Sequence, residues 1–285
     1  MNEPRLKFHL GLSASGFHRL AYREWGPPEA SRLLVCVHGL TRNGRDFDEL
    51  AAIASAAGWR VVCPDVVGRG DSDALADPSG YSFPQYLQDM NALLARLDVA
   101  EVDWVGTSMG GLIGMLLAAQ PGNPLRRLVL NDIGPFLPRA ALEEIASQVA
   151  EERVWSDLES AHAELRQAYE GFGPLEEQEW QRLIERSLMR TPDGRWRRNF
   201  DPAVGRVFAQ SIEGDVDLWA FWERVRLPVL LLRGGQSRLL TAEIAAEMKV
   251  RGPGAEVVEF PLSGHAPALM QKDQISVILD WLQTS

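Results

Sequence analysis

One short stretch, Gly106-Thr107-Ser108-Met109-Gly110, constrains the fold more than any other part of the sequence. It follows the apolar, β-prone residues 102–105 and leads directly into the helix-forming segment 112–119. In this strand–turn–helix context the pattern Gly-x-Ser-x-Gly predicts a serine at the tip of a tight turn, where a Cβ atom on either flanking glycine would clash. The turn would expose the Ser108 hydroxyl, and the helix N-terminus behind it would stabilise a developing anion. The alternative, a glycine-rich turn that contains a serine by chance, is disfavoured by the flanking strand and helix.

The composition favours a globular protein and argues against nucleic acid and anionic membranes as partners. The 285 residues are 46% hydrophobic, which is enough for a substantial core. A formal net charge of -10 argues against binding to nucleic acid or to anionic membrane surfaces. Cys36 and Cys63 both lie in apolar runs, so we expect two buried, unbonded thiols in a reducing compartment. No apolar leader or membrane-length run is present, and a cytoplasmic protein without a membrane span is expected.

Strand and helix patterns alternate through most of the chain. This alternation predicts a parallel sheet with helices on both faces, preceded by a hairpin at one edge. Functional residues in such sheets gather at the carboxyl ends of the strands, where His38, Asp65, Ser108 and Asp132 are expected. The predicted strands are 8–12, 19–25, 32–37, 59–63, 102–105, 125–130, 229–232 and 256–260, and the predicted helices are 46–57, 83–97, 241–249 and 274–282.

The segment 136–223 differs from the rest because strand signals disappear from it. Helices are predicted there at 138–152, 157–169, 176–189 and 216–224. We interpret the segment as a helical cap inserted between two core parts, 1–135 and 224–285. Five of the nine tryptophans lie in it, and they could line a binding pocket or pack the cap together; packing is favoured for most of them. These are Trp155, Trp180, Trp196, Trp219 and Trp222.

A serine hydroxyl needs an adjacent base to act as a nucleophile, and five histidines are available. His265 follows the last predicted strand in the loop Ser-Gly-His-Ala, a position that suits the general base for Ser108. His38 ends another strand and is expected to orient its loop. His9 and His18 lie on the predicted hairpin, and His162 lies in a polar helix of the cap.

The order of these features resembles that of the α/β-hydrolase fold with a helical cap, in the lipase/esterase and ring-cleavage-hydrolase branch. The resemblance covers nearly the whole chain and depends on His38-Gly39, the Gly-x-Gly loop between Asp65 and Ser72, the serine turn and Gly264-His265. It implies a mostly parallel, eight-stranded sheet and a serine hydrolase that needs no cofactor or metal. It also implies an oxyanion hole formed by the backbone N–H groups of Leu40 and Met109.

The acidic partner of the histidine is where this sequence departs from the family. An aspartate is usual in the loop after strand 229–232, but the chain has Arg238 there, and a guanidinium has no acceptor for a histidine N–H. Some α/β-hydrolases take the acid from the preceding strand end, where this chain has Asp132. We therefore predict that Asp132 orients His265, the alternative being that Asp132 only caps the entry to the cap. Asp65 is expected to bind loop amides, and the turn Gly68-Arg69-Gly70 is expected to have only a structural role.

Two classes of function remain open. The first is a serine hydrolase that cleaves a carboxylic ester, or a related acyl bond, of a small molecule through an acyl-enzyme on Ser108. A C–C bond hydrolase of ring-cleavage products is its enzymatic rival, whereas haloalkane dehalogenases and epoxide hydrolases carry aspartate in place of Ser108. The second class is a ligand-binding, receptor-like member with little turnover, which Arg238 favours. The sequence names no substrate and leaves the oligomeric state open, with a homodimer as one candidate.

Overall fold

The computed structural model describes residues 3–284, which are built around one eight-stranded sheet. Its strand order is β1-β2-β4-β3-β5-β6-β12-β13; the six strands from β4 to β13 are parallel, and β1 and β2 form an antiparallel hairpin at one edge. The predicted fold class is therefore confirmed. The strands are β1 (Arg5–Ser13), β2 (Gly16–Trp25), β3 (Leu33–Val37), β4 (Arg60–Pro64), β5 (Val102–Thr107), β6 (Leu125–Asn131), β12 (Val229–Gly234) and β13 (Ala255–Phe260).

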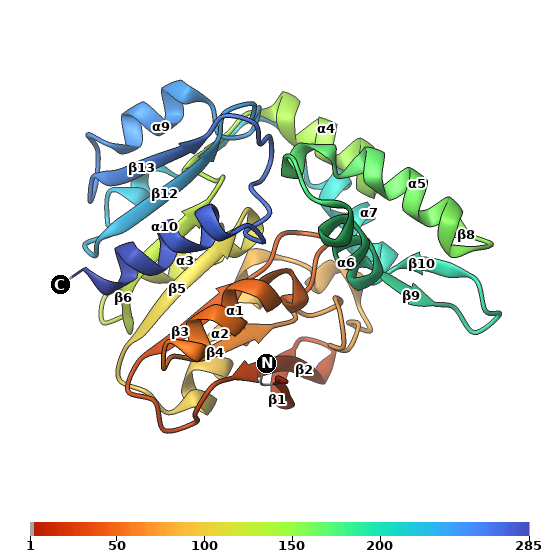
Figure 1. Cartoon of the computed structure of the whole chain (residues 1–285), viewed down its shortest axis with the longest axis horizontal. Coiled ribbons are helices and arrows are strands. Elements are labelled where there is room, and N and C mark those ends of the chain that lie inside the picture. Colours follow the sequence, from red (N-terminus) through yellow and green to blue (C-terminus); the bar gives the residue numbers. More distant parts are fainter. Residues whose placement is uncertain (1–2, 285) are drawn as a thin grey trace.

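Helices cover both faces of the sheet because the central strands are apolar on both sides (Figure 1). The helices α1 (Asp48–Ala56) and α10 (Lys272–Gln283) pack on one face. The helices α2 (Phe83–Leu97), α3 (Met109–Ala118) and α9 (Ala242–Met248) pack on the other. Two short 3-10 helices, η1 (Gly44–Phe47) and η2 (Pro78–Gly80), lie in the loops after β3 and β4. The five helices predicted outside the insertion, including the helix-forming segment 112–119 that corresponds to α3, are confirmed, with shifts of a few residues at some ends.

The chain between β6 and β12 leaves the sheet and forms a separate layer beside it (Figure 1). This insertion has its own small apolar core, which contains Trp155 and Trp180. Trp219 and Trp222 join the main core instead, so the packing role expected for most of these tryptophans is confirmed. Its elements are β7 (Phe136–Leu137), α4 (Arg139–Val149), β8 (Val154–Trp155), α5 (Leu158–Ala168), η3 (Glu170–Phe172), α6 (Glu177–Ser187), β9 (Leu188–Arg190), β10 (Trp196–Arg198), α7 (Pro202–Gln210), β11 (Val216–Asp217) and α8 (Trp219–Trp222).

Two expectations about the insertion were wrong, and one of its helices was not predicted. It does contain strands, because β8, β10 and β9 form one small sheet and β11 pairs with β7. Strands of two or three residues are too short to show an alternating pattern in the sequence. The helix expected over 216–224 starts only at Trp219, since Val216 and Asp217 are paired with β7. Helix α7 was not predicted, although its start carries recognisable signals: Pro202 at the first position and an Asp201 cap that accepts from the Ala203 N–H.

The loop after β3 is fixed by a buried histidine, His38. Its Nε2 accepts a hydrogen bond from the Val66 backbone N–H at 2.9 Å. Because a backbone N–H can only donate, the ring proton is on Nδ1, which donates to the Gly39 carbonyl at 2.7 Å. Burial, with the nearby Arg69 and Arg42 cations, lowers the pKa of His38 to about 3. The ring is therefore a neutral support for this loop, which agrees with the orienting role expected from the sequence.

This histidine makes the folded state acid-sensitive. In the unfolded chain His38 takes up a proton near its usual pKa of 6.5, whereas the folded protein resists protonation down to about 3. Stability is therefore lost as the pH falls from 6.5 toward 3, by up to about 1.4 kcal/mol per pH unit from this residue. Urea unfolding of the wild type and His38→Gln between pH 7 and 4.5 measures the effect. Glutamine keeps a donor and an acceptor but cannot titrate, so its slope against pH should be shallower; equal slopes would contradict the assignment.

Candidate active site

Ser108 lies between the end of β5 and the start of α3 in a strained backbone conformation, with φ 51° and ψ -115°. The two glycines around it are sterically required. A Cβ atom on Gly106 would lie 2.3 Å from the Gly110 carbonyl oxygen, and one on Gly110 would lie 2.0 Å from that of Val37. The predicted tight turn is therefore present, and its side chain is directed away from the sheet toward the loop after β13.

The structure brings together the three side chains that were selected from the sequence. His265 Nε2 lies 2.9 Å from Ser108 Oγ, and His265 Nδ1 lies 2.7 Å from Asp132 Oδ2. Asp132 is fully buried, and the His265 side chain is 24% exposed. Because a carboxylate only accepts hydrogen bonds, Nδ1 carries the proton and Nε2 is free to accept one from the serine hydroxyl. Residues from the ends of β5, β6 and β13 thus form one continuous hydrogen-bonded chain.

Asp132 is held by two further donors, one at the end of β12 and one in the loop that follows it. The Gly234 N–H donates to Oδ1 at 2.7 Å, and the Ser237 hydroxyl donates to Oδ2 at 2.6 Å. Ser237 also accepts from the Leu240 N–H at 3.1 Å, which orients the hydroxyl proton toward the carboxylate. This role of Ser237 was not predicted from the sequence. A signal was available, because Ser237 lies in the loop where the family usually places the acid.

Arg238, the residue that replaces the usual acid, takes no part in this arrangement. Its side chain is 80% exposed, and its guanidinium lies 3.4 Å from Glu144 of helix α4. An ion pair so exposed to water contributes little stability, and the arginine side chain lies on the surface. The loop after β12 therefore supplies donors to Asp132, while the carboxylate itself comes from the end of β6.

Met109 follows the serine directly, and Leu40 lies in the loop after β3, which packs on the serine turn. Met109 is the first residue of α3, so its N–H has no acceptor within the helix. The Leu40 loop packs on the serine turn, since a Cβ atom on Gly39 would lie 3.7 Å from Ser108 Cβ. Arg69 joins both regions: its Nε donates to the Leu40 carbonyl at 2.8 Å, and its Nη2 lies 3.6 Å from Met109 Sδ.

Arg69 is 1% exposed and fixes the loop after β4 beneath the site. Its Nη1 donates to the Val67 carbonyl, and its Nη2 donates to Tyr86 Oη at 3.1 Å. The Gly-Arg-Gly turn was read from the sequence as structural only, without its link to the Leu40 loop. Asp65 has the loop-binding role expected of it, because it accepts from the Gly44 and Asp71 N–H groups.

The insertion reaches the site through η3 and the residues around it. The Gly264 N–H, next to His265, donates to the Gly171 carbonyl at 2.7 Å. Arg42, two residues after Leu40, is 5% exposed and lies over the rings of Tyr169 and Phe172, at 4.8 and 5.5 Å from their centroids. Its guanidinium also donates to Asp46 and to Ser187 at the end of α6. These contacts hold the insertion against the loops that carry the site.

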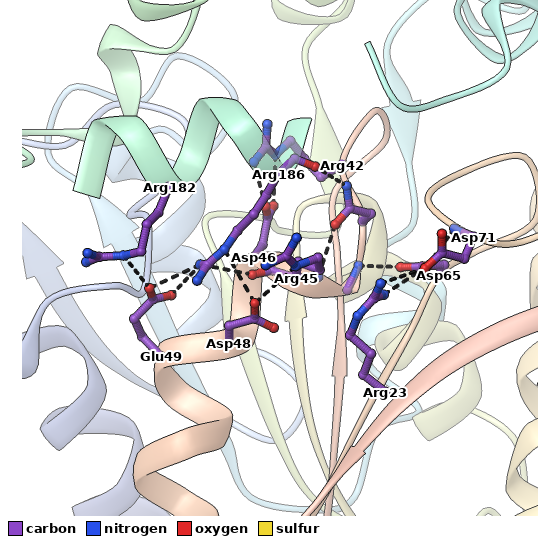
Figure 2. A network of polar contacts seen from close by, with 12 residues as sticks. Arg23, Arg42, Arg45, Asp46, Asp48, Glu49, Asp65, Asp71, Arg182 and Arg186 are labelled. Carbon is purple, nitrogen blue, oxygen red and sulfur yellow. Dashed lines mark hydrogen bonds and ion pairs between the residues drawn. The ribbon is translucent and has the colours of Figure 1, made fainter. Parts of the chain in front are cut away.

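A second set of contacts joins helix α6 of the insertion to helix α1 of the core (Figure 2). Arg186 lies 2.8 Å from Glu49 and 3.4 Å from Asp48, and Arg182 lies 3.0 Å from the same Glu49. Arg186 is only 11% exposed, so its pairs are less screened by solvent than ordinary surface pairs. The insertion is therefore anchored to the core both through these ion pairs with α1 and through the Arg42 contact with Ser187.

Residues 3–284 were also searched for a metal site, a membrane-spanning helix and further cavities. No three His, Cys, Asp or Glu side chains in that range are arranged to hold a metal ion. Within the same range, every helix is too short or too polar to cross a membrane. A shallow hollow of about 830 Å³, lined by Leu227, Pro228 and Trp281 among others, opens at the amino ends of β12 and β13, the end of the sheet opposite Ser108.

Comparison with known proteins gives consistent matches across the chain. The family model described as alpha/beta hydrolase fold matches residues 32–269. A 3-hydroxybutyrate-oligomer hydrolase from Cupriavidus necator is 45% identical over 282 residues, which are 96% of this chain and 96% of that protein. A 2-(acetamidomethylene)succinate hydrolase from Mesorhizobium japonicum is 26% identical and covers 82% of this chain and 81% of its own length.

A solved structure of a putative hydrolase from Rickettsia typhi superimposes with a TM-score of 0.91 at 32% identity, and all of both chains is covered. The family match, this full-length likeness and the strand order of the sheet agree with the resemblance drawn from the sequence. This chain belongs to the α/β-hydrolase-fold family and is a hydrolase.

Proposed function

We propose that this protein is a serine esterase that cleaves the ester bonds of short 3-hydroxybutyrate oligomers through an acyl-enzyme on Ser108. The observation that carries the proposal is the hydrogen-bonded chain from Ser108 through His265 to Asp132. The choice of substrate follows the 45% identity to the Cupriavidus necator oligomer hydrolase over nearly the full length of both proteins. These oligomers are small molecules, and their linkages are carboxylic esters, the bond type expected from the sequence.

In the acylation step, Ser108 Oγ attacks the ester carbonyl carbon while His265 Nε2 accepts the hydroxyl proton. Asp132 keeps the His265 proton on Nδ1 and stabilises the imidazolium that forms. The carbonyl oxygen becomes an oxyanion, which the N–H groups of Leu40 and Met109 bind. Each such donor lowers the barrier by about 3 kcal/mol when it is aimed at the developing charge.

The intermediate collapses when His265 returns the proton to the leaving alkoxide, which departs as the hydroxyl end of one fragment. Water then enters, His265 Nε2 accepts one of its protons, and the resulting hydroxide attacks the acyl-enzyme carbonyl. A second oxyanion forms in the same place and collapses, so that Ser108 regains its proton and the other fragment leaves as a carboxylic acid. The proton transfers use Ser108, His265 and Asp132, which are already hydrogen-bonded to one another, and no step requires a cofactor.

The receptor-like alternative has lost the feature that favoured it. Arg238 suggested an incomplete site, but its side chain lies on the surface and Asp132 occupies the partner position on His265.

We propose the cytoplasm as the place of action, supported by Cys36 and Cys63, which are both buried and unbonded.

Asp132→Asn tests the acid assignment. Asparagine preserves the shape but lets His265 adopt the wrong tautomer, so kcat for p-nitrophenyl butyrate should fall by about 10³- to 10⁴-fold. Steady-state hydrolysis at pH 7.5 measures the loss. The matched control is Arg238→Ala, which removes the residue at the usual acid position and should leave kcat within about twofold, because that side chain is exposed. An active Asp132→Asn enzyme, or an inactive Arg238→Ala enzyme, would contradict the assignment.

If the substrate proposal is correct, the enzyme releases 3-hydroxybutyrate from its linear dimer and trimer. Chromatography of the products measures this release. Ser108→Ala should abolish both this release and labelling by a fluorophosphonate probe, because both require the serine nucleophile. A wild type that is labelled but leaves the oligomers intact would keep the serine mechanism and reject the substrate. Cleavage of a ring-cleavage dienoate in preference to any ester would favour the C–C hydrolase instead.

A further inference from the structure

The core holds the loop around His265 at two points. The Ser263 carbonyl accepts from the Gln236 N–H at 2.9 Å, and the Pro267 carbonyl accepts from the Asn131 side chain, also at 2.9 Å. Each of these points lies two residues from His265 along the chain. The backbone between them therefore determines where the imidazole ring can reach.

The middle of this loop is packed between the core and the insertion. From the core, Gly234 approaches so closely that a Cβ atom on it would lie 2.0 Å from the Gly264 carbonyl oxygen. From the insertion, the Gly171 carbonyl of η3 accepts from the Gly264 N–H at 2.7 Å. A Cβ atom on Gly171 would lie 3.5 Å from the His265 carbonyl oxygen, so η3 runs beside the backbone of the histidine itself. The position of this backbone depends on η3 as well as on β12.

Gly173 follows η3 directly and lets it approach the histidine loop. Its φ of 99° and ψ of -173° lie in a region that is essentially restricted to glycine. A Cβ atom on Gly173 would also lie 2.6 Å from Oγ of Ser263, and Ser263 is 2% exposed. A side chain at position 173 would therefore force the backbone into another conformation and separate η3 from the loop.

The same turn is also fixed to the loop that carries Leu40. Arg42 lies over the rings of Tyr169 and Phe172, which are stacked with their centroids 5.3 Å apart. These two aromatic residues flank Gly171 in the sequence. Because Arg42 comes two residues after Leu40, η3 connects the loop of a proposed oxyanion donor with the loop of the proposed base.

We propose that η3 and Gly173 position His265 for proton transfer, so that the docking of the insertion on the core sets kcat. This inference rests on the proposed function, because it requires His265 to accept the Ser108 proton. Gly173 touches no reacting atom and acts through Gly264 on the histidine. His265 Nε2 lies 2.9 Å from Ser108 Oγ, and a displacement of about 1 Å can reduce a rate by about 10²-fold.

Hydrolysis of p-nitrophenyl butyrate by Gly173→Ala tests the proposal. The kcat should fall by about 10- to 100-fold while KM stays within about threefold, because the base is displaced and the acyl group still binds. The matched control is Gly194→Ala, between β9 and β10 of the same insertion. Gly194 also has a positive φ, 84°, but a Cβ atom there would have nothing within 4 Å, so kcat should stay within about twofold of the wild type. A Gly173→Ala enzyme with the kcat of this control, or with a raised KM alone, overturns the proposal.

Hydrogen exchange of the Gly264 amide shows whether the loss of rate comes through η3. This amide should exchange at least about tenfold faster in Gly173→Ala than in the wild type and Gly194→Ala, because its acceptor on Gly171 moves away. The amides of β5 should stay protected in all three proteins, which excludes global unfolding. A fall in kcat without faster exchange at Gly264, or faster exchange with an unchanged kcat, overturns the proposal.

A second variant, Phe172→Ala, loosens η3 from the side of Arg42 without altering a glycine. It should lower kcat and speed the exchange of the Gly264 amide, as Gly173→Ala does. If both measurements equal those of the wild type, the proposal is overturned.

Labelling by the fluorophosphonate probe separates this inference from the proposed function. If Ser108 of the wild type is labelled quickly and Gly173→Ala is labelled at the same rate, only the positioning role is overturned. If the wild type is not labelled at all, the proposed function and this inference are both overturned. The natural substrate does not enter, because the probe and p-nitrophenyl butyrate both report on Ser108 directly.

Discussion

The carboxylate of Asp132 is the point at which three strand ends meet. It follows β6, it accepts from Gly234 at the end of β12 and from Ser237 in the next loop, and it accepts from His265 of the loop after β13. A fully buried carboxylate is costly unless its oxygens are hydrogen-bonded, and here both oxygens have strong donors. The interaction therefore fixes the histidine ring and, through it, the hydrogen bond to Ser108.

The rest of the fold positions the partners of this carboxylate. The parallel sheet brings the ends of β5, β6, β12 and β13 to one side, although these strands are separated by up to about half the chain. The glycines at 106 and 110 let α3 approach β3 closely enough to lift Ser108 into reach of His265. Arg69 and the neutral His38 then hold the loop that carries Leu40. Each support is buried, so the site depends on the core rather than on mobile surface contacts.

The sequence was informative where a motif and a position directly after a predicted strand together indicated the chemistry of a residue. Ser108, His265 and Asp132 could be selected because the proposed nucleophile, base and acid are each expected after a particular strand, and the arginine at position 238 directed the search for the acid to the end of β6. Ser237 and Arg69 could not be assigned in this way, because serine and arginine have many roles and only the tertiary contacts reveal their partners. The short strands of the insertion were missed for a related reason: two or three paired residues carry no periodic signal.

The bond between His265 and Asp132 can be observed directly by proton NMR. A histidine Nδ1 proton shared with a buried carboxylate is strongly deshielded and resonates far downfield of the amide protons. The wild type and Arg238→Ala should both show this resonance, and Asp132→Asn should lose it while the amide spectrum of the fold is retained. A resonance that persists in Asp132→Asn, or that disappears in Arg238→Ala, would show that the acid beside His265 is not Asp132.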